Sequence, residues 1–482
     1  MENNLKRKVM TGLAWTFGER IAAQGVSFIV SVIIARLLDP TENGVVALIL
    51  VFINIANVFV TNGFGEALVQ KQNSDEIDFS SVFYCSFASA IILYFGLFIS
   101  APMIASFYEQ PILTGLIRVL AIKIPISAIS TIQHAYVSKH MIFKKFFFST
   151  LGGTLFSGVV GIFAAYYGFG PWALVFQYLT NTTIDTIVLF ITVPWRPKFV
   201  FSASRAKSLI GYSWKLTATG LITSVYNELR SLIIGKVYSP ADLAYYNRGN
   251  QLPTIVINNL DTAIGKVVFP AMVTCKDDAS RLKTLEKKAM SATTYLIFPL
   301  LVALAVMAEQ LITVVYTTKW LPCVPFLRIL CVYWATQPIQ TMNWQVLKAC
   351  GRSDLCFKLE IVKKGFGLVL LFATMKISVR ALAISACITG ILALVINALP
   401  VKKLIDYSLT EQIMDLCPAA IMSAIMGFGM YTVSLFVSNI YFQIVAQGIV
   451  GVVIYLVLSV VTKNESLKML VNVLLGIVKR RK

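Results

Sequence analysis

Charged residues and histidines are scarce in this sequence. Only 13% of its 482 residues are charged, whereas soluble domains carry about 25%. This shortage argues strongly against a soluble protein. Histidine occurs only at His134 and His140, so a histidine-rich metal centre is excluded as well. The eight cysteines show no CxxC spacing and lie mostly in apolar stretches, which predicts small buried residues.

Sequence signatures of catalysis are also missing. The chain contains no P-loop, HExxH or GxSxG motif, and no long polar segment that could fold as a soluble catalytic domain. These absences disfavour ATP hydrolysis and hydrolytic chemistry. We predict that the protein is not an enzyme and that it holds no metal or cofactor.

Long apolar runs make up most of the chain. Hydrophobic residues account for 57% of it, and a run of about 20 apolar residues suits a transmembrane helix. Such runs predict fourteen spans, near residues 11–37, 44–65, 80–104, 111–137, 147–167, 171–193, 208–236, 243–270, 288–315, 322–347, 355–375, 379–400, 412–437 and 440–462. The predicted fold is an all-α, polytopic membrane helical bundle of about 14 transmembrane helices.

Positive charge is in excess and unevenly placed. The 42 Lys and Arg outnumber the 23 Asp and Glu, which gives a net charge of +19. With these spans, 28 cations lie in the terminal segments and alternate loops, and only 5 in the opposite loops. Loops retained in the cytoplasm are enriched in Lys and Arg, so both termini are predicted to be cytoplasmic. Twelve spans with two re-entrant segments satisfy the same count.

Two parts of the chain resemble each other. Residues 33–40 match residues 233–240 at an offset of 200, and residues 116–120 match residues 326–330 at an offset of 210. Each repeat holds six spans, so the halves share one orientation in the membrane, an architecture found in transporters. We predict two parallel six-helix lobes, residues 1–205 and 206–405. Residues 406–482 are predicted to add two transmembrane helices and a basic amphipathic cytoplasmic tail.

Nine cations fall inside predicted spans. Each costs about 2.5–3.5 kcal/mol at the centre of a span, so such residues face a protein interior or a water-filled cavity. Anions are fewer there, so the interior is predicted to be cationic and to suit a phosphate-bearing or acidic-sugar substrate. Eight of the nine form the predicted substrate-binding set: Arg20, Arg118, Lys123, Arg230, Arg248, Arg328, Lys363 and Lys364.

Other roles are open for several of these cations. Glu360 precedes Lys363 and Lys364 by three and four residues, which favours a helical ion pair. Arg248 and the ninth cation, Lys215, lie close enough to span ends to reach the interface.

Five cations are predicted to line the cavity on grounds of position. Arg118 and Arg328 occupy equivalent positions of the repeat, and Arg20, Lys123 and Arg230 lie deeper in their spans. A guanidinium group can hold phosphate oxygens through two hydrogen bonds, while a lysine acts as a point charge.

Three acidic residues within the spans are candidates for coupling or charge balance, namely Asp185, Glu228 and Asp261. Asp185 and Asp261 could bind a proton or a sodium ion that drives transport, or they could only balance neighbouring cations, which we favour. Coupling to a proton, to sodium or to the membrane potential stays open. The aromatic residues placed either to stack on sugars or to serve in packing are Tyr226, Trp334 and Trp344.

Several segments resemble one known family. They are residues 35–44, 211–214, 239–253, 319–320 and 351–355, among which the run Ser239 to Arg248, SPADLAYYNR, is the most distinctive. In order and spacing the chain resembles the polysaccharide transporter branch of the multidrug/oligosaccharidyl-lipid/polysaccharide (MOP) flippase superfamily. Within that branch it looks like the lipopolysaccharide, O-antigen or colanic-acid exporter type. The resemblance covers nearly the whole chain.

The resemblance implies a function. Such a protein is expected in the bacterial cytoplasmic (inner) membrane, where it carries an undecaprenyl-diphosphate-linked oligosaccharide to the outer leaflet by alternating access. Its partners are then an anionic lipid-linked oligosaccharide and the bilayer, with a glycan polymerase and glycosyltransferases nearby and no nucleic acid. The alternatives are a multidrug or cation antiporter of the same superfamily and a membrane-embedded glycan polymerase or ligase.

The charge distribution generates a testable topology. We expect green fluorescent protein fused after Lys482 to fluoresce, and alkaline phosphatase fused there to be inactive, because the fluorescent protein folds in the cytoplasm and the phosphatase outside it. The same two proteins fused before Met1 should give the same results, with fluorescence from the first and no activity from the second. An active phosphatase at either end would contradict the predicted orientation.

Overall fold

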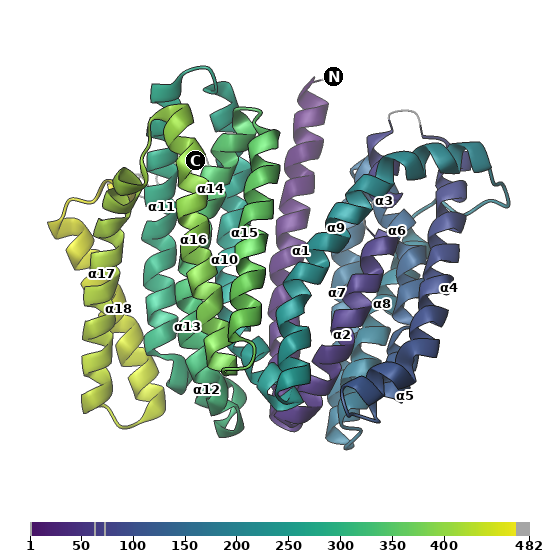
Figure 1. Cartoon of the computed structure of the whole chain (residues 1–482), viewed down its shortest axis with the longest axis horizontal. Helices are drawn as coiled ribbons and strands as arrows, with labels where there is room; N and C mark the ends of the chain where they lie inside the picture. The colour runs from purple at the N-terminus through teal and green to yellow at the C-terminus, as the bar shows by residue number, and fades with distance from the viewer. Residues whose placement is uncertain (1, 62–63, 72–73, 469–482) are drawn as a thin grey trace. The chain divides into compact units, whose positions relative to one another are not determined.

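The structure, a computed structural model, describes residues 2–61, 64–71 and 74–468. Within these ranges the chain consists of α-helices and one short 3-10 helix, with no β-strand (Figure 1). The predicted all-α fold is confirmed. The side chain of Arg20 lies outside the described residues, and so does the predicted basic tail beyond Lys468.

The helices coincide with the predicted spans. Each of the fourteen predicted spans falls on one helix or on two or three consecutive helices. Among the described residues, nine helical segments are long and apolar enough to cross a membrane, and the count of fourteen stays a prediction. Helices α9 (Ala203–Val237), α10 (Pro240–Thr274) and α15 (Ser353–Thr374) are long but fall outside the nine, because they carry many charged and polar residues.

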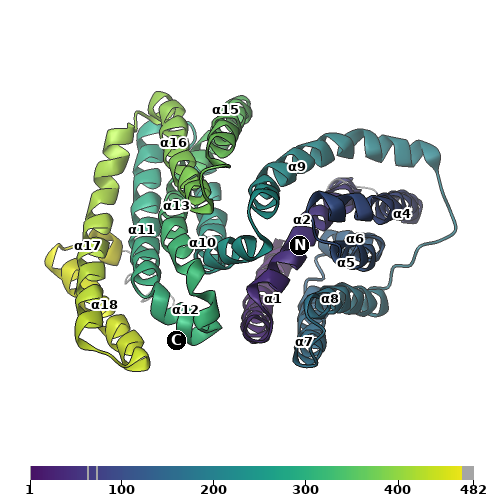
Figure 2. The same cartoon turned by 60° about the horizontal axis from the view of Figure 1, so that its bottom comes forward.

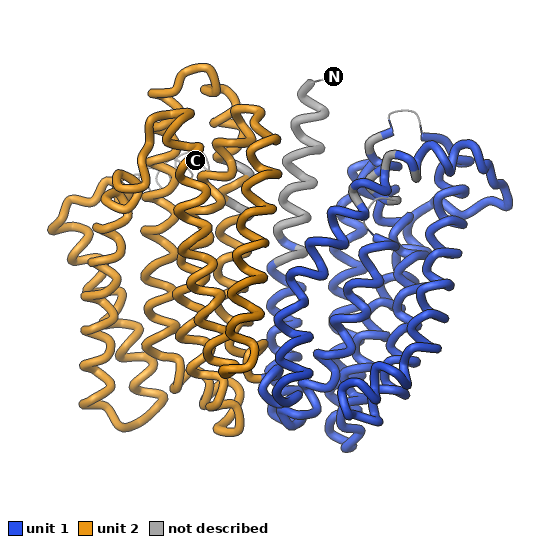
Figure 3. The backbone as a smooth tube through the Cα atoms, viewed as in Figure 1, with its two compact units in different colours: residues 1–244 blue, residues 245–482 orange. Residues whose placement is uncertain are grey.

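Contacts between helices divide the chain into two compact units, Met1–Ala244 and Tyr245–Lys482 (Figure 3). Before α9, unit 1 contains α1 (Glu2–Leu37), α2 (Pro40–Thr61), α3 (Phe64–Gln70), α4 (Glu76–Phe107), α5 (Leu113–Leu120), α6 (Lys123–His140), α7 (Lys144–Tyr166) and α8 (Pro171–Thr192). Helix α7 packs along α8 and α1 (Figures 1 and 2). Helix α9 packs on α2, α3 and α4, and therefore joins unit 1. The predicted lobe boundaries follow the repeat and stay a prediction.

Unit 2 contains most of α10 and the helices that follow it. These are α11 (Ala279–Val306), α12 (Ala308–Tyr316), the 3-10 helix η1 (Thr318–Cys323), α13 (Val324–Ala335), α14 (Gln337–Ala349), α15, α16 (Val379–Ile405), α17 (Leu409–Phe436) and α18 (Ile440–Val461). Helix α17 packs along α11 and α18, and α16 packs on α13, α14 and α15. A buried cluster that includes Met290, Met342 and Tyr407 joins α11, α14 and the connection between α16 and α17.

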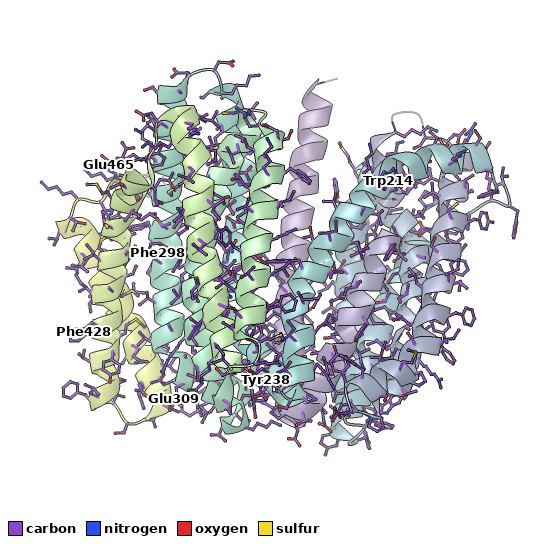
Figure 4. The ribbon with its side chains drawn as sticks, viewed as in Figure 1. Trp214, Tyr238, Phe298, Glu309, Phe428 and Glu465 are labelled. Carbon is purple, nitrogen blue, oxygen red and sulfur yellow. The ribbon has the colours of Figure 1, made fainter. Side chains whose placement is uncertain are left out.

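Large apolar side chains are exposed on the outer faces of the helices. Phe428 on α17 is 70% exposed and Trp214 on α9 is 57% exposed (Figure 4). An apolar surface of this kind suits contact with lipid rather than water. The exposed faces therefore agree with a polytopic membrane protein.

The two matching corners of the repeat have the same hydrogen bonds. After α1, the backbone N–H of Asp39 donates to Oε2 of Glu42 at 2.9 Å, and after α9, that of Ser239 donates to Oδ2 of Asp242 at 3.3 Å. A carboxylate three residues after the N-cap is the geometry of a capping box. A proline begins the helix in both places, where a missing N–H leaves no hydrogen bond unmade. The repeat is thus present in local structure as well as in sequence.

Ion pairs join the ends of α4 and α9. The Asp75 carboxylate caps α4 by accepting from the backbone N–H of Asp78 at 3.0 Å, and it also accepts from Arg205. These two hydrogen bonds, first that from Arg205, lower the pKa of Asp75 to about 2. The buried Asp78 pairs with Lys71 at 2.7 Å. Ion pairs among Lys71, Asp75, Asp78 and Arg205 therefore hold this end of unit 1 together.

Gly44 lies where the start of α2 meets the start of α10. A Cβ atom at Gly44 would lie 1.7 Å from the carbonyl oxygen of Pro240. The contact is with backbone, so no side chain can rotate out of the way. Glycine at this position is what permits the two helix starts to touch.

We expect Gly44→Ala to destabilise unit 1 by about 1–3 kcal/mol, because the added methyl group overlaps the Pro240 carbonyl. Gly152→Ala in α7 is the matched control, since a Cβ there meets nothing within 4 Å. The measurement is the thermal midpoint of the protein purified in detergent. Equal midpoints for the two variants would contradict the contact.

Candidate functional site

Arg118 and Arg328 hold backbone carbonyls. Arg118 on α5 donates from Nε to the Phe98 carbonyl of α4 at 3.3 Å, and its guanidinium lies 4.5 Å from the Phe98 ring centroid. Pro102 follows four residues later in α4 and has no N–H, so the Phe98 carbonyl lacks its helical donor. Arg328 on α13 donates from Nε to the Ala305 carbonyl at 3.2 Å, in the last turn of α11, where helix carbonyls lack partners. The two arginines at equivalent positions of the repeat thus have the same role, which is to donate a hydrogen bond to a free backbone carbonyl.

Arg248 packs on aromatic rings in unit 2. Its guanidinium carbon lies 4.7 Å from the ring centroids of both Tyr316 and Trp320, and both of these rings are fully buried. Its Nη1 donates to Oε1 of Gln251 at 2.8 Å. Cation–π contacts strengthen when water is excluded, so this packing fixes the orientation of the guanidinium. The side chain ties α10 to α12 and η1.

Lys363 and Lys364 form the helical ion pair that the sequence left open. Lys363 Nζ lies 2.6 Å from Oε1 of Glu360, and Lys364 Nζ lies 3.9 Å from Oε2. Lys363 also lies 4.8 Å from the ring centroid of Trp344. One carboxylate therefore compensates part of the positive charge on α15.

Lys123 and Arg230 lack a carboxylate partner among the described residues. Lys123 begins α6, is half-buried, and lies 5.6 Å from the ring centroid of Tyr178. Arg230 is half-buried in α9, and its buried Nε has no acceptor within the described part of the chain. Lys215, also on α9, is exposed. Because an uncompensated buried charge is expensive, Lys123 and Arg230 are the predicted cations best placed to receive an anion.

Two of the predicted coupling acids accept hydrogen bonds from neutral side chains. Glu228 on α9 accepts from Nδ2 of Asn54 at 3.1 Å, and Asp261 on α10 accepts from Oγ1 of Thr341 at 2.8 Å. Neither forms an ion pair with a Lys or Arg that the structure describes. Among the described residues these two carboxylates therefore have neutral hydrogen-bond partners, and their roles in coupling or charge balance stay predictions.

The third acid, Asp185, has a partner outside the predicted set. Its Oδ2 lies 3.3 Å from Nε2 of His134, which joins α8 to α6. His134 is not among the predicted site residues, because a single histidine in an apolar run has no distinctive spacing. The pattern that marks it is a polar stripe on α6, in which Lys123, Thr131 and His134 share one face.

Two predicted aromatic residues are engaged inside unit 2. Trp334 donates from Nε1 to Oδ1 of Asn250 at 2.7 Å. Trp344 lies 4.8 Å from Lys363 and 5.9 Å from Lys348, measured from its ring centroid. These contacts favour packing over sugar stacking. Among the described residues there is also no group of three or more His, Cys, Asp or Glu that could hold a metal ion.

A model of a known protein family matches this chain. The family is described as polysaccharide biosynthesis protein, and the match runs over residues 33–325, more than half of the chain. The chain belongs to this family. The resemblance drawn from the short sequence segments is thereby confirmed.

Curated proteins with similar sequences carry related names. The chain is 25% identical over 440 residues to the teichuronic acid biosynthesis protein TuaB of Bacillus subtilis (strain 168), covering 90% of each chain. It is 22% identical over 480 residues to the succinoglycan biosynthesis transport protein ExoT of Rhizobium meliloti (strain 1021), covering 97% of this chain and 95% of ExoT. It is 24% identical over 368 residues to the lipopolysaccharide biosynthesis protein WzxC of Escherichia coli (strain K12), covering 75% and 74%.

Solved structures show the same fold. The lipid II flippase MurJ in an inward closed conformation superposes with a TM-score of 0.77 at 15% identity, covering 95% of this chain and 99% of MurJ. An inward-facing multidrug resistance transporter of the MATE family, in the MOP superfamily, gives 0.59 at 14% identity, covering 80% and 98%. The predicted polytopic membrane helical bundle is confirmed, and its fold is shared by solved structures named as a flippase and as a multidrug resistance transporter.

We expect Arg118→Ala to lower stability by about 1–2 kcal/mol, because the Phe98 carbonyl then has no donor. Pro102→Ala returns a backbone N–H to α4 at the position that would satisfy this carbonyl. The Arg118→Ala substitution should therefore destabilise the Pro102→Ala protein less than it destabilises the natural one. Thermal midpoints of the four proteins give the comparison, and equal losses in both backgrounds would contradict this role of Arg118.

Proposed function

We propose that this protein is a flippase that moves an undecaprenyl-diphosphate-linked oligosaccharide from the inner to the outer leaflet of the bacterial cytoplasmic membrane. The product would enter polysaccharide biosynthesis, as lipopolysaccharide or exopolysaccharide. The family match over residues 33–325 carries the proposal. The helical transporter fold supports it.

The electrostatics of unit 1 support an anionic substrate. A diphosphate is the most charged part of a lipid-linked oligosaccharide, and it needs cations when it leaves water. Lys123 and Arg230 are half-buried and have no carboxylate partner among the described residues. A guanidinium can hold two phosphate oxygens at once, while a lysine supplies a point charge. Both interactions gain strength where water is scarce.

Alternating access is the proposed route for the head group. Each unit is a compact body with its own helical contacts, and movement between two such bodies can expose a site to one side of the membrane at a time. The apolar lipid tail can stay in the bilayer while the sugar and diphosphate cross. A glycan polymerase and glycosyltransferases are the proposed neighbouring activities, and both termini are proposed to be cytoplasmic.

Two other functions are less well supported. A multidrug or cation antiporter needs acids that are available to a cation, whereas Glu228 and Asp261 already accept hydrogen bonds. Lys123 and Arg230, in turn, have no carboxylate partner within the described part of the chain. A glycan polymerase or ligase needs room for an acceptor chain. Among the described residues the longest connection between helices is residues 193–202, which is short for such a role.

Charge reversal at the uncompensated cations tests the substrate site. We expect Lys123→Glu and Arg230→Glu each to reduce flipping at least about tenfold, since losing one charge-assisted contact weakens binding by about 1.4 kcal/mol or more. The measurement is transfer of a fluorescent undecaprenyl-diphosphate oligosaccharide between leaflets of reconstituted vesicles. Covalent change of the lipid is followed in the same samples.

Lys215→Glu is the matched control, because Lys215 lies on α9 like Arg230 but is exposed. It should flip the lipid at the rate of the natural protein. Equal rates for all three variants would overturn the assignment of Lys123 and Arg230. If the glycan grew and the lipid did not change leaflet, the proposal that the protein is a transporter would be wrong.

A further inference from the structure

The His134–Asp185 pair is a histidine–carboxylate contact between two helices of unit 1. His134 Nε2 on α6 lies 3.3 Å from Asp185 Oδ2 on α8, and the His134 ring lies against Phe146, with centroids 4.9 Å apart. The carboxylate is mostly buried, with 17% of its side chain exposed, while the imidazole is 41% exposed. Solvent can therefore reach the histidine, while the protein encloses most of the aspartate side chain.

The second oxygen of Asp185 has no hydrogen-bond partner among the residues that the structure describes. Oδ1 is buried and accepts no hydrogen bond within the described residues. The helix on its other side comes close, because a Cβ at Gly153 of α7 would lie 3.0 Å from the Asn181 carbonyl and 3.5 Å from the Asp185 nitrogen. The Asp185 carboxylate is therefore closely packed, and among the described residues His134 is its only side-chain partner.

A pocket opens beside the histidine. Its volume is about 490 Å³, and it is lined by Thr61, Gly65, Val69, Thr131, His134, Ala135 and Ser138 from α2, α3 and α6. On the predicted topology this end of α6 is the cytoplasmic end. Water in the pocket can reach the imidazole, so a proton has a path to His134 that does not cross lipid.

The pocket continues a polar stripe along α6. Lys123, Ser127, Thr131, His134 and Ser138 recur at three- or four-residue spacing on one face of the helix. In a membrane-spanning helix, polar residues are rare and mark wet or functional surfaces. The stripe places the His134–Asp185 pair on the same helix face as the uncompensated Lys123.

The other charged or titratable residues of α6 do not contact the His134–Asp185 pair. Lys139 donates from Nζ to the Lys71 carbonyl at 2.7 Å, and His140 donates from Nδ1 to a carbonyl of its own helix at 2.9 Å. Lys123 lies about three turns before His134. None of these groups shares the proton of the pair.

Charges on the helices packed against α6 are also engaged elsewhere. On α4, Asp78 forms an ion pair with Lys71. On α7, Lys144 lies beside an aromatic ring, and Lys145 donates to a backbone carbonyl. Helix α2 has its acidic residue in the first turn, at its other end, and α3 carries Glu66, whose side chain lies outside the described residues. His134 is therefore the one described basic group in contact with Asp185.

The second repeat does not reproduce the pair. At the offset of 210 that aligns Thr131 with Thr341, the residue corresponding to His134 is Trp344. In unit 2 this tryptophan packs beside lysines, and Thr341 donates to Asp261 at 2.8 Å. The fold of a repeat thus forms without an imidazole at this position. Because packing of the repeat does not require a histidine here, we infer that His134 has a role other than packing.

We propose that the His134–Asp185 pair binds the proton that drives flipping, a proposal that rests on the proposed function. Because the carboxylate only accepts, Nε2 of the neutral imidazole carries the hydrogen toward Asp185, and the incoming proton adds to Nδ1. The pair then changes from a net charge of −1 to 0. Closing the pocket over a neutral pair avoids burying an uncompensated carboxylate. The proton comes from the outer side, along the polar stripe of α6, while the pocket is closed, and it leaves to the cytoplasm when the pocket opens. An inward proton gradient therefore speeds the return of the protein to the state in which the pocket is open to the cytoplasm.

Histidine is the side chain suited to this role near neutral pH, because its charge changes in that range. The test uses the full-length protein in vesicles of phosphatidylethanolamine and phosphatidylglycerol. The probe is undecaprenyl diphosphate carrying a fluorescent N-acetylglucosamine. Its flipping rate is measured with and without a gradient of one pH unit, and a pH dye inside the vesicles reports proton flux. The variants are His134→Gln, Asp185→Asn and, as the matched control, His140→Gln, which removes the other histidine.

The natural protein and His140→Gln should flip faster with the gradient, by up to about tenfold, and should carry protons with the lipid. His134→Gln and Asp185→Asn should flip at a rate that the gradient does not change. A gradient response in these two variants equal to that of His140→Gln would overturn the proton site. No flipping by the natural protein under any condition would overturn the proposed function and this inference together. Two independent variants keep the test decisive if one of them fails to insert.

Discussion

A polar group without a partner is expensive inside a bilayer, and the arrangement of this protein depends on how each such group is satisfied. Arg118 and Arg328 are examples, since each donates to a carbonyl that its own helix leaves free. Arg248 is held between buried aromatic rings. Lys123 and Arg230 differ from these residues, because neither has a carboxylate partner among the residues that the structure describes.

The two units share a repeat but differ in chemistry. Their corners at Pro40 and Pro240 carry equivalent capping hydrogen bonds, so the same local physics builds both. Away from the corners, unit 1 places an imidazole beside a carboxylate, whereas unit 2 places a tryptophan at the corresponding position. The two copies therefore share their local turns, while the side chains at corresponding positions of α6 and α14 differ. Residues at corresponding positions of a duplicated fold can diverge, because only some of these positions are needed for stability.

The fold was largely predictable from the sequence, and the site only in part. Apolar runs locate helices because a bilayer demands them, and short motifs indicated the family. The partners of the charges were not predictable in the same way. That Arg118 serves the Phe98 carbonyl follows from Pro102 on another helix, a contact that periodicity along one helix does not contain. His134 was missed because its partner lies about fifty residues away on α8. The Glu360 ion pair was foreseen, since its spacing is local.

The contact between Gly44 and Pro240 also bears on biosynthesis. The first corner of unit 1 packs against a backbone carbonyl that lies close to two hundred residues further along the chain. A chain emerging from the ribosome is made from its N-terminus at about 5–20 residues per second. The helices of unit 1 can therefore enter the membrane one after another, but the unit completes its packing only after α9 and the first residues of α10 have been translated. A ribosome stalled before Pro240 would hold a lobe whose second helix still lacks its neighbour.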